Sequence, residues 1–224
     1  MHSGPEIASF PPQPASATTR ARPVGFAIAA AIFVIALALD VPISNWAHNS
    51  GLAPAMKNAT GAAHYFIHYG LRFYGQIGFC LAACFVLWLQ GRHQIGLVVL
   101  LSGIFSSSNQ FFKWCFGRFR PFHNMPPFAL HPFIGGIPGF IHAEVSLGFP
   151  SGDATLAFAM TASLTWAWPR RQKLWWALGI WTCLERIAEG AHYPSDTVAG
   201  ACLGLFVASV ARQIVKLFAK VPPA

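Results

Sequence analysis

Most of the side chains that could do chemistry lie in three short polar groups separated by apolar sequence. These groups are residues 113–121, 150–153 and 185–196. Lys113, Arg120 and Arg186 supply positive charge, and the two arginines present forked sets of hydrogen-bond donors. Such donors suit a phosphate, whose oxygens accept several hydrogen bonds at once. If the fold brings the groups together, they predict a site for a phosphorylated compound.

The second and third groups add features that could bind and attack the same anion. Pro150-Ser151-Gly152 is typical of a helix start, where free N–H groups and the helix dipole favour an anion. Gly152 would allow the backbone to approach closely. His192 is a candidate nucleophile, and Asp196 could fix the tautomer and orientation of its ring.

The elements that must position these residues have the composition of a membrane protein. Of 224 residues, 54% are hydrophobic and only 10% are charged, whereas soluble domains average about 25% charged residues. This excludes a typical soluble globule and a disordered chain. The net charge of +8 would suggest nucleic acid in a soluble protein, but the cations here lie mostly between apolar segments. A nucleic-acid partner is therefore not expected.

Six apolar segments are predicted to be transmembrane helices: residues 24–39, 71–89, 95–112, 151–168, 174–191 and 195–218. They predict an all-α fold, a six-helix bundle that forms one membrane-embedded domain over residues 24–220. Residues 1–23, rich in Pro, Ser and Ala, are predicted to be a disordered cytoplasmic tail. A signal peptide that ends near residue 40 is the alternative.

The distribution of Lys and Arg predicts the orientation. Nine of the fifteen lie on the side of the two termini: Arg20, Arg22, Arg92, Arg170, Arg171, Lys173, Arg212, Lys216 and Lys220. The positive-inside rule then places both termini in the cytoplasm, and the long loop of residues 113–150 with all three polar groups outside. Residues 40–69 predict a short amphipathic helix at the outer interface. The expected location is a multi-pass position in a bacterial inner membrane.

The three groups also have the residues and spacing of a known family. They read Lys113-x6-Arg120-Pro121, Pro150-Ser151-Gly152-Asp153 and Glu185-Arg186-x5-His192-x3-Asp196. This pattern resembles the type 2 phosphatidic acid phosphatase (PAP2) superfamily, which also includes vanadium haloperoxidases and bacterial acid phosphatases. The motifs of the family are Lys-x6-Arg-Pro, Pro-Ser-Gly-His and Ser-Arg-x5-His-x3-Asp. The haloperoxidases are soluble, so the predicted transmembrane helices favour the lipid phosphatase branch.

The resemblance implies a role for each matched residue. His192 would attack phosphorus and form a phosphohistidine that water hydrolyses, with Asp196 behind the ring. The implied phosphate-binding residues are Lys113, Arg120, Ser151, Gly152 and Arg186. The implied substrate is a lipid phosphate or diphosphate among membrane lipids. No metal, other cofactor or obligate protein partner is expected.

Two residues depart from the family motifs. Glu185 stands in place of the third-motif Ser, and Asp153 stands in place of the second-motif His. That His is the general acid for the leaving group in the family. Asp153 could act as the acid itself, or it could simply favour the start of a helix. One of the loop histidines, His123, His131 or His142, could also replace the missing acid.

The remaining charged residues have simpler interpretations. Arg118 is expected to anchor a lipid headgroup, and Glu185 and Glu189 are expected to neutralise Arg186 and Arg120. The loop histidines and Glu144 match no known spacing of metal ligands.

Three functions fit these residues. The favoured one is hydrolysis of a lipid phosphate, or preferably of a polyprenyl diphosphate such as undecaprenyl diphosphate, at the outer leaflet. The second is a phosphotransferase that passes the phosphate to a lipid or sugar acceptor. The third is a catalytically impaired protein that binds lipid phosphate.

Overall fold

The computed structural model describes residues 21–52, 55–56, 72–123 and 128–219. Most of the predicted N-terminal tail, and residues 57–69 of the predicted interfacial element, lie outside these ranges. The described residues form helices and turns with two isolated β-bridges, Arg118 to Leu130 and Phe119 to Leu147. The all-α prediction is therefore confirmed.

Eight α-helices are described, with three short 3-10 helices between them. They are α1 (Ala21–Asn49), η2 (Arg72–Gly75), α4 (Ile77–Leu89), α5 (His93–Ser106), α6 (Asn109–Phe116), η3 (Pro121–His123), α7 (Gly136–Ser146), α8 (Gly152–Ala167), η4 (Pro169–Arg171), α9 (Gln172–Ala188) and α10 (Pro194–Phe218). Each of the six predicted apolar segments falls largely on helix.

Three of the described helical segments are long and apolar enough to cross a membrane. They are Gly25–Asn49, His93–Phe116 and Pro194–Phe218. The helix α4 is apolar but has only 13 residues, and α8 and α9 have 16 and 17. An integral membrane protein is therefore supported, and the count of six spans stays a prediction.

Three boundaries differ from the prediction. The first helix was expected to end at residue 39, but α1 continues to Asn49, because Asp40 is completely buried and ion-paired rather than exposed at an interface. The third predicted span divides into α5 and α6 at Ser107 and Ser108. The loop of residues 113–150 is partly helical and carries η3 and α7.

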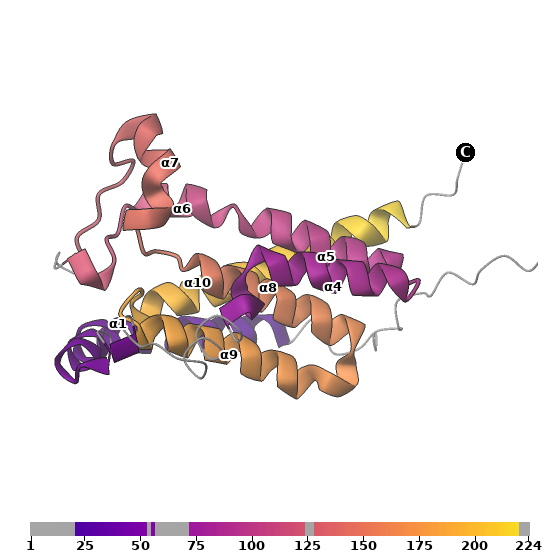
Figure 1. Ribbon diagram of the computed structural model, residues 1–224, viewed down its shortest axis with the longest axis horizontal. Coiled ribbons are helices and arrows are strands. Elements are labelled where there is room, and N and C mark those ends of the chain that lie inside the picture. Colours follow the sequence, from indigo (N-terminus) through magenta and orange to yellow (C-terminus); the bar gives the residue numbers. More distant parts are fainter. Residues whose placement is uncertain (1–20, 53–54, 57–71, 124–127, 220–224) are drawn as a thin grey trace, which may run out of the picture.

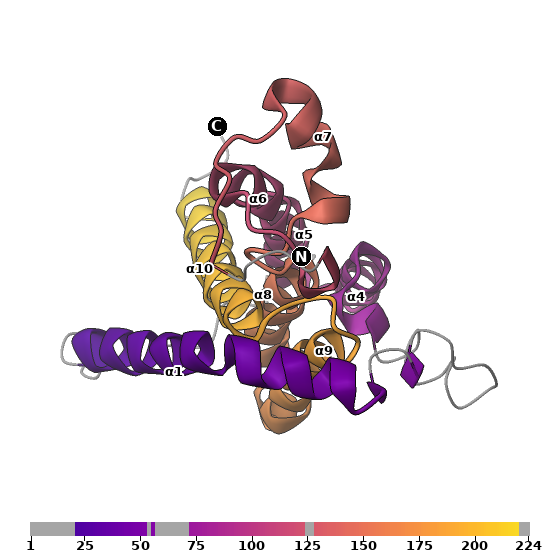
Figure 2. The ribbon, with the colours of Figure 1, turned by 90° about the vertical axis from the view of Figure 1, so that its left-hand side faces the viewer.

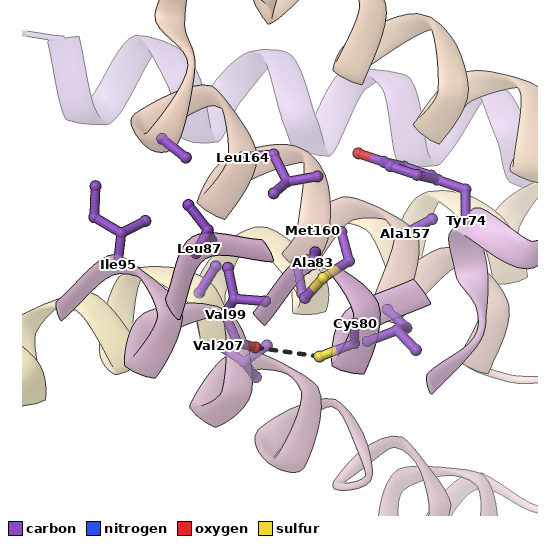
Figure 3. Close-up of a cluster of buried hydrophobic side chains, with 14 residues drawn as sticks. Tyr74, Cys80, Ala83, Leu87, Ile95, Val99, Ala157, Met160, Leu164 and Val207 are labelled. Atoms are coloured by element: carbon purple, nitrogen blue, oxygen red, sulfur yellow. Dashed lines mark hydrogen bonds between the residues drawn. The ribbon is translucent and has the colours of Figure 1, made fainter. Parts of the chain in front are cut away.

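The helix α8 lies at the centre of the bundle. It packs against α5, α9 and α10, and most of its residues are buried. Figure 1 shows α4, α5, α8, α9 and α10 running along the long axis, and Figure 2 shows α1 crossing them at a steep angle. The core cluster in Figure 3 joins α4, α5, α8 and α10 through side chains such as Leu87, Val99, Met160 and Val207.

Two glycines let α10 approach α8 closely. A Cβ atom at Gly204 would lie 2.2 Å from the Thr155 carbonyl oxygen, and one at Gly200 would lie 2.5 Å from that of Ser151. This is the small-residue spacing that brings membrane helices together. As a result, the N-terminus of α10, with Asp196, lies beside the N-terminus of α8, with Ser151.

The two ends of the bundle differ in character. The α4–α5 and α8–α9 turns lie at the end opposite α7 (Figure 1). At that end Arg92 stacks over Trp168 at 5.5 Å, and Arg212 stacks over Trp166 at 4.4 Å. Basic residues interleaved with Trp are typical of a membrane–water interface. The three polar groups gather at the other end.

Candidate active site

The first turns of α8 and α10 are joined directly. The Ser151 backbone N–H donates to the Asp196 carbonyl at 2.9 Å. Ser151 is also the N-cap of α8, since its hydroxyl accepts from the Ala154 N–H at 3.5 Å. A Cβ atom at Gly148 would lie 2.9 Å from Oδ2 of Asp196. Glycine at this position therefore keeps space beside the carboxylate.

His192 lies in the short turn between α9 and α10 and is only 3% exposed. The backbone N–H groups of Ala191 and His192 both donate to the Arg186 carbonyl, at 3.1 and 3.3 Å. The Nδ1 atom of His192 is 3.6 Å from Oδ2 of Asp196, which is close but longer than a hydrogen bond. The ring therefore presents Nδ1 to the carboxylate and leaves Nε2 for other chemistry.

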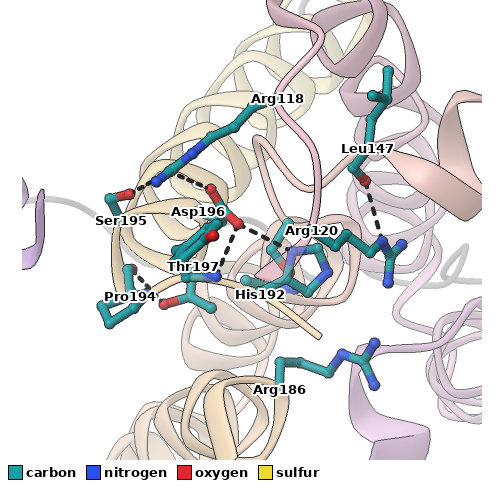
Figure 4. A network of polar contacts seen from close by, with 12 residues as sticks. Arg118, Arg120, Leu147, Arg186, His192, Pro194, Ser195, Asp196 and Thr197 are labelled. Carbon is teal, nitrogen blue, oxygen red and sulfur yellow. Dashed lines mark hydrogen bonds and ion pairs between the residues drawn. The ribbon is translucent and has the colours of Figure 1, made fainter. Parts of the chain in front are cut away.

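Three cations surround this histidine. Lys113, Arg120 and Arg186 are buried, and Arg120 Nε donates to the Leu147 carbonyl at 3.3 Å. Figure 4 shows the imidazole between Asp196 on one side and the guanidinium groups of Arg120 and Arg186 on the other. The first, second and third polar groups thus meet at one place.

Burial and these cations together set the protonation state of the histidine. Burial lowers the pKa of His192 well below 6.5, and the charges of Arg120, Arg186 and Lys113 lower that pKa further. A hydrogen bond with the backbone of Gly148 acts in the opposite direction. A neutral imidazole at physiological pH retains the lone pair that a nucleophile needs.

The interpretation of Arg118 as a lipid-headgroup anchor is wrong. Arg118 is only 3% exposed, and its two terminal nitrogens lie 2.7 Å from Asp40 and 2.7 Å from Asp196. Asp40, which is fully buried in α1, was not among the predicted site residues. An acidic residue in an apolar membrane helix is itself a signal of function, but it was taken for the end of that helix.

The comparison with known proteins covers the three polar groups but not Asp40. The profile of the PAP2 superfamily matches residues 93–219, more than half of the chain, and this range includes all three polar groups. The chain belongs to the PAP2 superfamily.

The chain is also similar to curated phosphatases from other organisms. The chain is 36% identical over 124 residues to lipid A 1-phosphatase of Rhizobium etli, which covers 54% of this chain and 48% of that protein. It is 27% identical over 158 residues to glucose-6-phosphatase catalytic subunit 1 of Felis catus, covering 60% of this chain and 44% of that protein. The chain thus spans about half the length of the curated relatives it matches.

The solved structure supports the fold. The transmembrane PAP2-type phosphatidylglycerolphosphate phosphatase from Bacillus subtilis matches with a TM-score of 0.51 and 19% identity, covering 87% of this chain and 98% of that one. At this identity the likeness concerns the fold alone.

The two departures from the PAP2 motifs both lie beside Arg186. Oδ2 of Asp153 is 2.9 Å from Arg186 Nε, Glu189 pairs with Nη1, and Glu185 lies 4.0 Å from the same nitrogen. The expected neutralisation of Arg186 by Glu189 is confirmed. Asp153 also lies in the first turn of α8, so it combines a helix-start position with an ion pair. A phosphate that binds Arg186 must compete with these carboxylates.

The loop histidines occupy a different environment from His192. The rings of His123 and His131 each pack against Phe119 with centroids 5.5 Å apart. Within the part of the chain that the structure describes, neither ring forms an interaction with Asp153. Their role as a substitute acid stays a prediction.

Proposed function

We propose that this PAP2 chain is a membrane phosphatase that removes phosphate from a lipid phosphate, and preferentially from a lipid diphosphate of the polyprenyl type, at the outer leaflet. The observation that carries the proposal is the buried His192, placed between Asp196 and three buried cations beside the N-terminus of α8. Each part has a use in phosphoryl transfer, which depends mainly on positioning and on stabilising negative charge.

The proposed reaction has two steps. Nε2 of His192 forms a bond to phosphorus while the bond from phosphorus to the leaving lipid oxygen breaks. Asp196 faces Nδ1–H and stabilises the positive charge that the ring gains. Water then attacks the phosphohistidine, the N–P bond breaks, and inorganic phosphate leaves with the neutral imidazole restored. Lys113, Arg120, Arg186 and the N–H groups of the first turn of α8 would hold the phosphate oxygens in both steps.

The preference for a diphosphate rests on Asp153. This residue stands where the family has its general acid, and it is engaged as the anionic partner of Arg186. A carboxylate in an ion pair has no proton to give to a leaving group. A diphosphate, whose leaving group is itself a phosphate, depends less on such a proton.

A phosphate-release panel tests the proposal. Purified protein in one detergent is given phosphatidate, phosphatidylglycerophosphate, a polyprenyl diphosphate and lipid A, without any acceptor. We expect inorganic phosphate from at least one lipid, with the polyprenyl diphosphate fastest. Transfer only when a lipid or sugar acceptor is added would replace the hydrolase with a transferase. Binding without turnover of any substrate would contradict an enzymatic function.

The orientation can be tested with two introduced cysteines at opposite ends of the bundle. Ile137 on α7 and Lys173 at the start of α9 are both exposed. If the site faces outside, an impermeant thiol reagent added to intact cells labels Ile137→Cys but labels Lys173→Cys only after the membrane is opened. The unsubstituted chain gives the background from the native cysteines. The reverse pattern would place the site in the cytoplasm.

A further inference from the structure

A buried ion-pair network connects the first helix to the catalytic histidine. Asp40 lies in α1 with no exposed surface, and its Oδ2 atom is 2.7 Å from Nη2 of Arg118. The other terminal nitrogen of Arg118 is 2.7 Å from Oδ1 of Asp196. The second oxygen of Asp196 faces Nδ1 of His192 at 3.6 Å. The guanidinium of Arg118 therefore bridges the carboxylates of Asp40 and Asp196, and Asp196 in turn faces His192.

Asp40 also holds the start of α10. Its Oδ1 accepts from the Ser195 backbone N–H at 2.9 Å, and its Oδ2 accepts from the Ser195 hydroxyl at 2.6 Å. The Ser195 amide belongs to the first helical turn, whose N–H groups have no partner within the helix. A carboxylate at this end also interacts favourably with the helix dipole. Asp40 thus accepts hydrogen bonds from the start of α10, although it lies 155 positions before Ser195 in the chain.

We infer that Asp40 is a positioning residue for the proposed phosphoryl transfer, acting through Arg118 on Asp196. Asp40 binds one terminal nitrogen of Arg118, so only the other terminal nitrogen pairs with Asp196. Without Asp40 the second terminal nitrogen of Arg118 loses its carboxylate partner and can turn toward the second oxygen of Asp196, because a bidentate pair is the favoured geometry between arginine and a carboxylate. That would draw Oδ2 of Asp196 away from His192.

The position of Asp40 supports a functional role over a purely structural one. Only 11% of the apolar window of α1 is buried, so most of this helix faces its surroundings rather than the core. A buried ion pair is weak evidence for stability, since an apolar replacement is often as stable. In a membrane helix such a carboxylate is a functional candidate. This inference rests on the proposed function, because it concerns the same His192.

Steady-state kinetics of Asp40→Asn test the inference, with the best substrate of the release panel. We expect kcat to fall about 10–100-fold, the range found when the hydrogen-bond partner behind a metal-bound histidine is removed, with KM unchanged within about threefold. Asp40→Glu keeps the charge and should recover part of the loss. Ala36→Gly, one turn earlier on the same buried face of α1, loosens packing without touching the network and should keep wild-type kcat.

Non-additivity checks the proposed route through Arg118. If Asp40 acts through Arg118, the Asp40→Asn/Arg118→Gln double variant should be no slower than Arg118→Gln alone. Equal losses in Asp40→Asn and Ala36→Gly, or an unchanged kcat in Asp40→Asn, would overturn the inference.

The test stays decisive if Asp40→Asn does not fold. Arg118→Lys then takes its place, since it keeps the positive charge but loses the fork that joins Asp40 to Asp196. A wild-type kcat in Arg118→Lys would then overturn the inference. If the wild-type protein turns over no lipid, the proposed function is wrong and the role of Asp40 falls with it. If the wild type is active and Asp40→Asn is unaffected, only the role of Asp40 is wrong.

Discussion

His192→Ala is expected to abolish phosphate release, with a loss of at least about 10⁴-fold in kcat. The imidazole is the group that would form the bond to phosphorus, and the surrounding cations cannot replace a nucleophile. His48→Ala is the matched control, because His48 is exposed near the end of α1 and should keep full activity. Turnover by His192→Ala at the wild-type rate would contradict covalent catalysis at this position.

Asp196→Asn is expected to cost about 10⁴-fold in kcat, comparable with removal of the orienting aspartate in a Ser-His-Asp triad. In the present structure Oδ1 accepts from Arg118 and Oδ2 accepts from the Tyr193 N–H at 2.9 Å. An asparagine amide group would face a donor in either orientation, so the ring of His192 loses both its charge partner and its fixed position. Orthovanadate, which mimics five-coordinate phosphorus, should inhibit the wild type.

The proximity of the three polar groups could be predicted from the sequence because each has its own local signal. Lys113, Arg120 and His192 are ionisable residues next to apolar segments, and charge at membrane depth is rare without a function. The turn and helix-start residues around Ser151 then place the same chemistry at helix ends. The spacing of the motifs sufficed to predict that Lys113, Arg120 and Arg186 gather around His192.

The ion-pair network behind His192 could not be predicted in the same way. Asp40 and Arg118 are 78 positions apart, and each has an ordinary local explanation, as the end of a helix or as a headgroup anchor. Only the crossing of α1 over the start of α10 shows that the two charges neutralise each other. Gly200 and Gly204, by contrast, did carry a readable signal, since small residues four apart predict a close helix contact.

The ion pair of Asp153 with Arg186 leads to a further large expected effect, on the choice of substrate. A phosphomonoester expels an alkoxide, whose conjugate acid is an alcohol about as weakly acidic as water. A diphosphate expels a phosphate whose last pKa is about 6. The alkoxide therefore needs a proton during bond cleavage, and the phosphate does not. General acid catalysis typically contributes about 10²–10⁴-fold, so the preference for diphosphate is expected to lie in that range.

Asp153→His is therefore expected to raise phosphatidate hydrolysis selectively, by up to about 10²–10⁴-fold, and to leave polyprenyl diphosphate hydrolysis within about tenfold of wild type. Glu189→Gln is the matched control, because Glu189 pairs with the same Arg186 but does not occupy the position of the acid. If the gain came from freeing Arg186 of a carboxylate partner, Glu189→Gln and Asp153→Asn would each raise the hydrolysis rates of both lipids by a similar factor. Initial rates on the two lipids in the same detergent measure the ratio. Wild-type rates that are equal on phosphatidate and polyprenyl diphosphate would refute the leaving-group argument, because an enzyme without an acid cannot expel an alkoxide as fast as a phosphate.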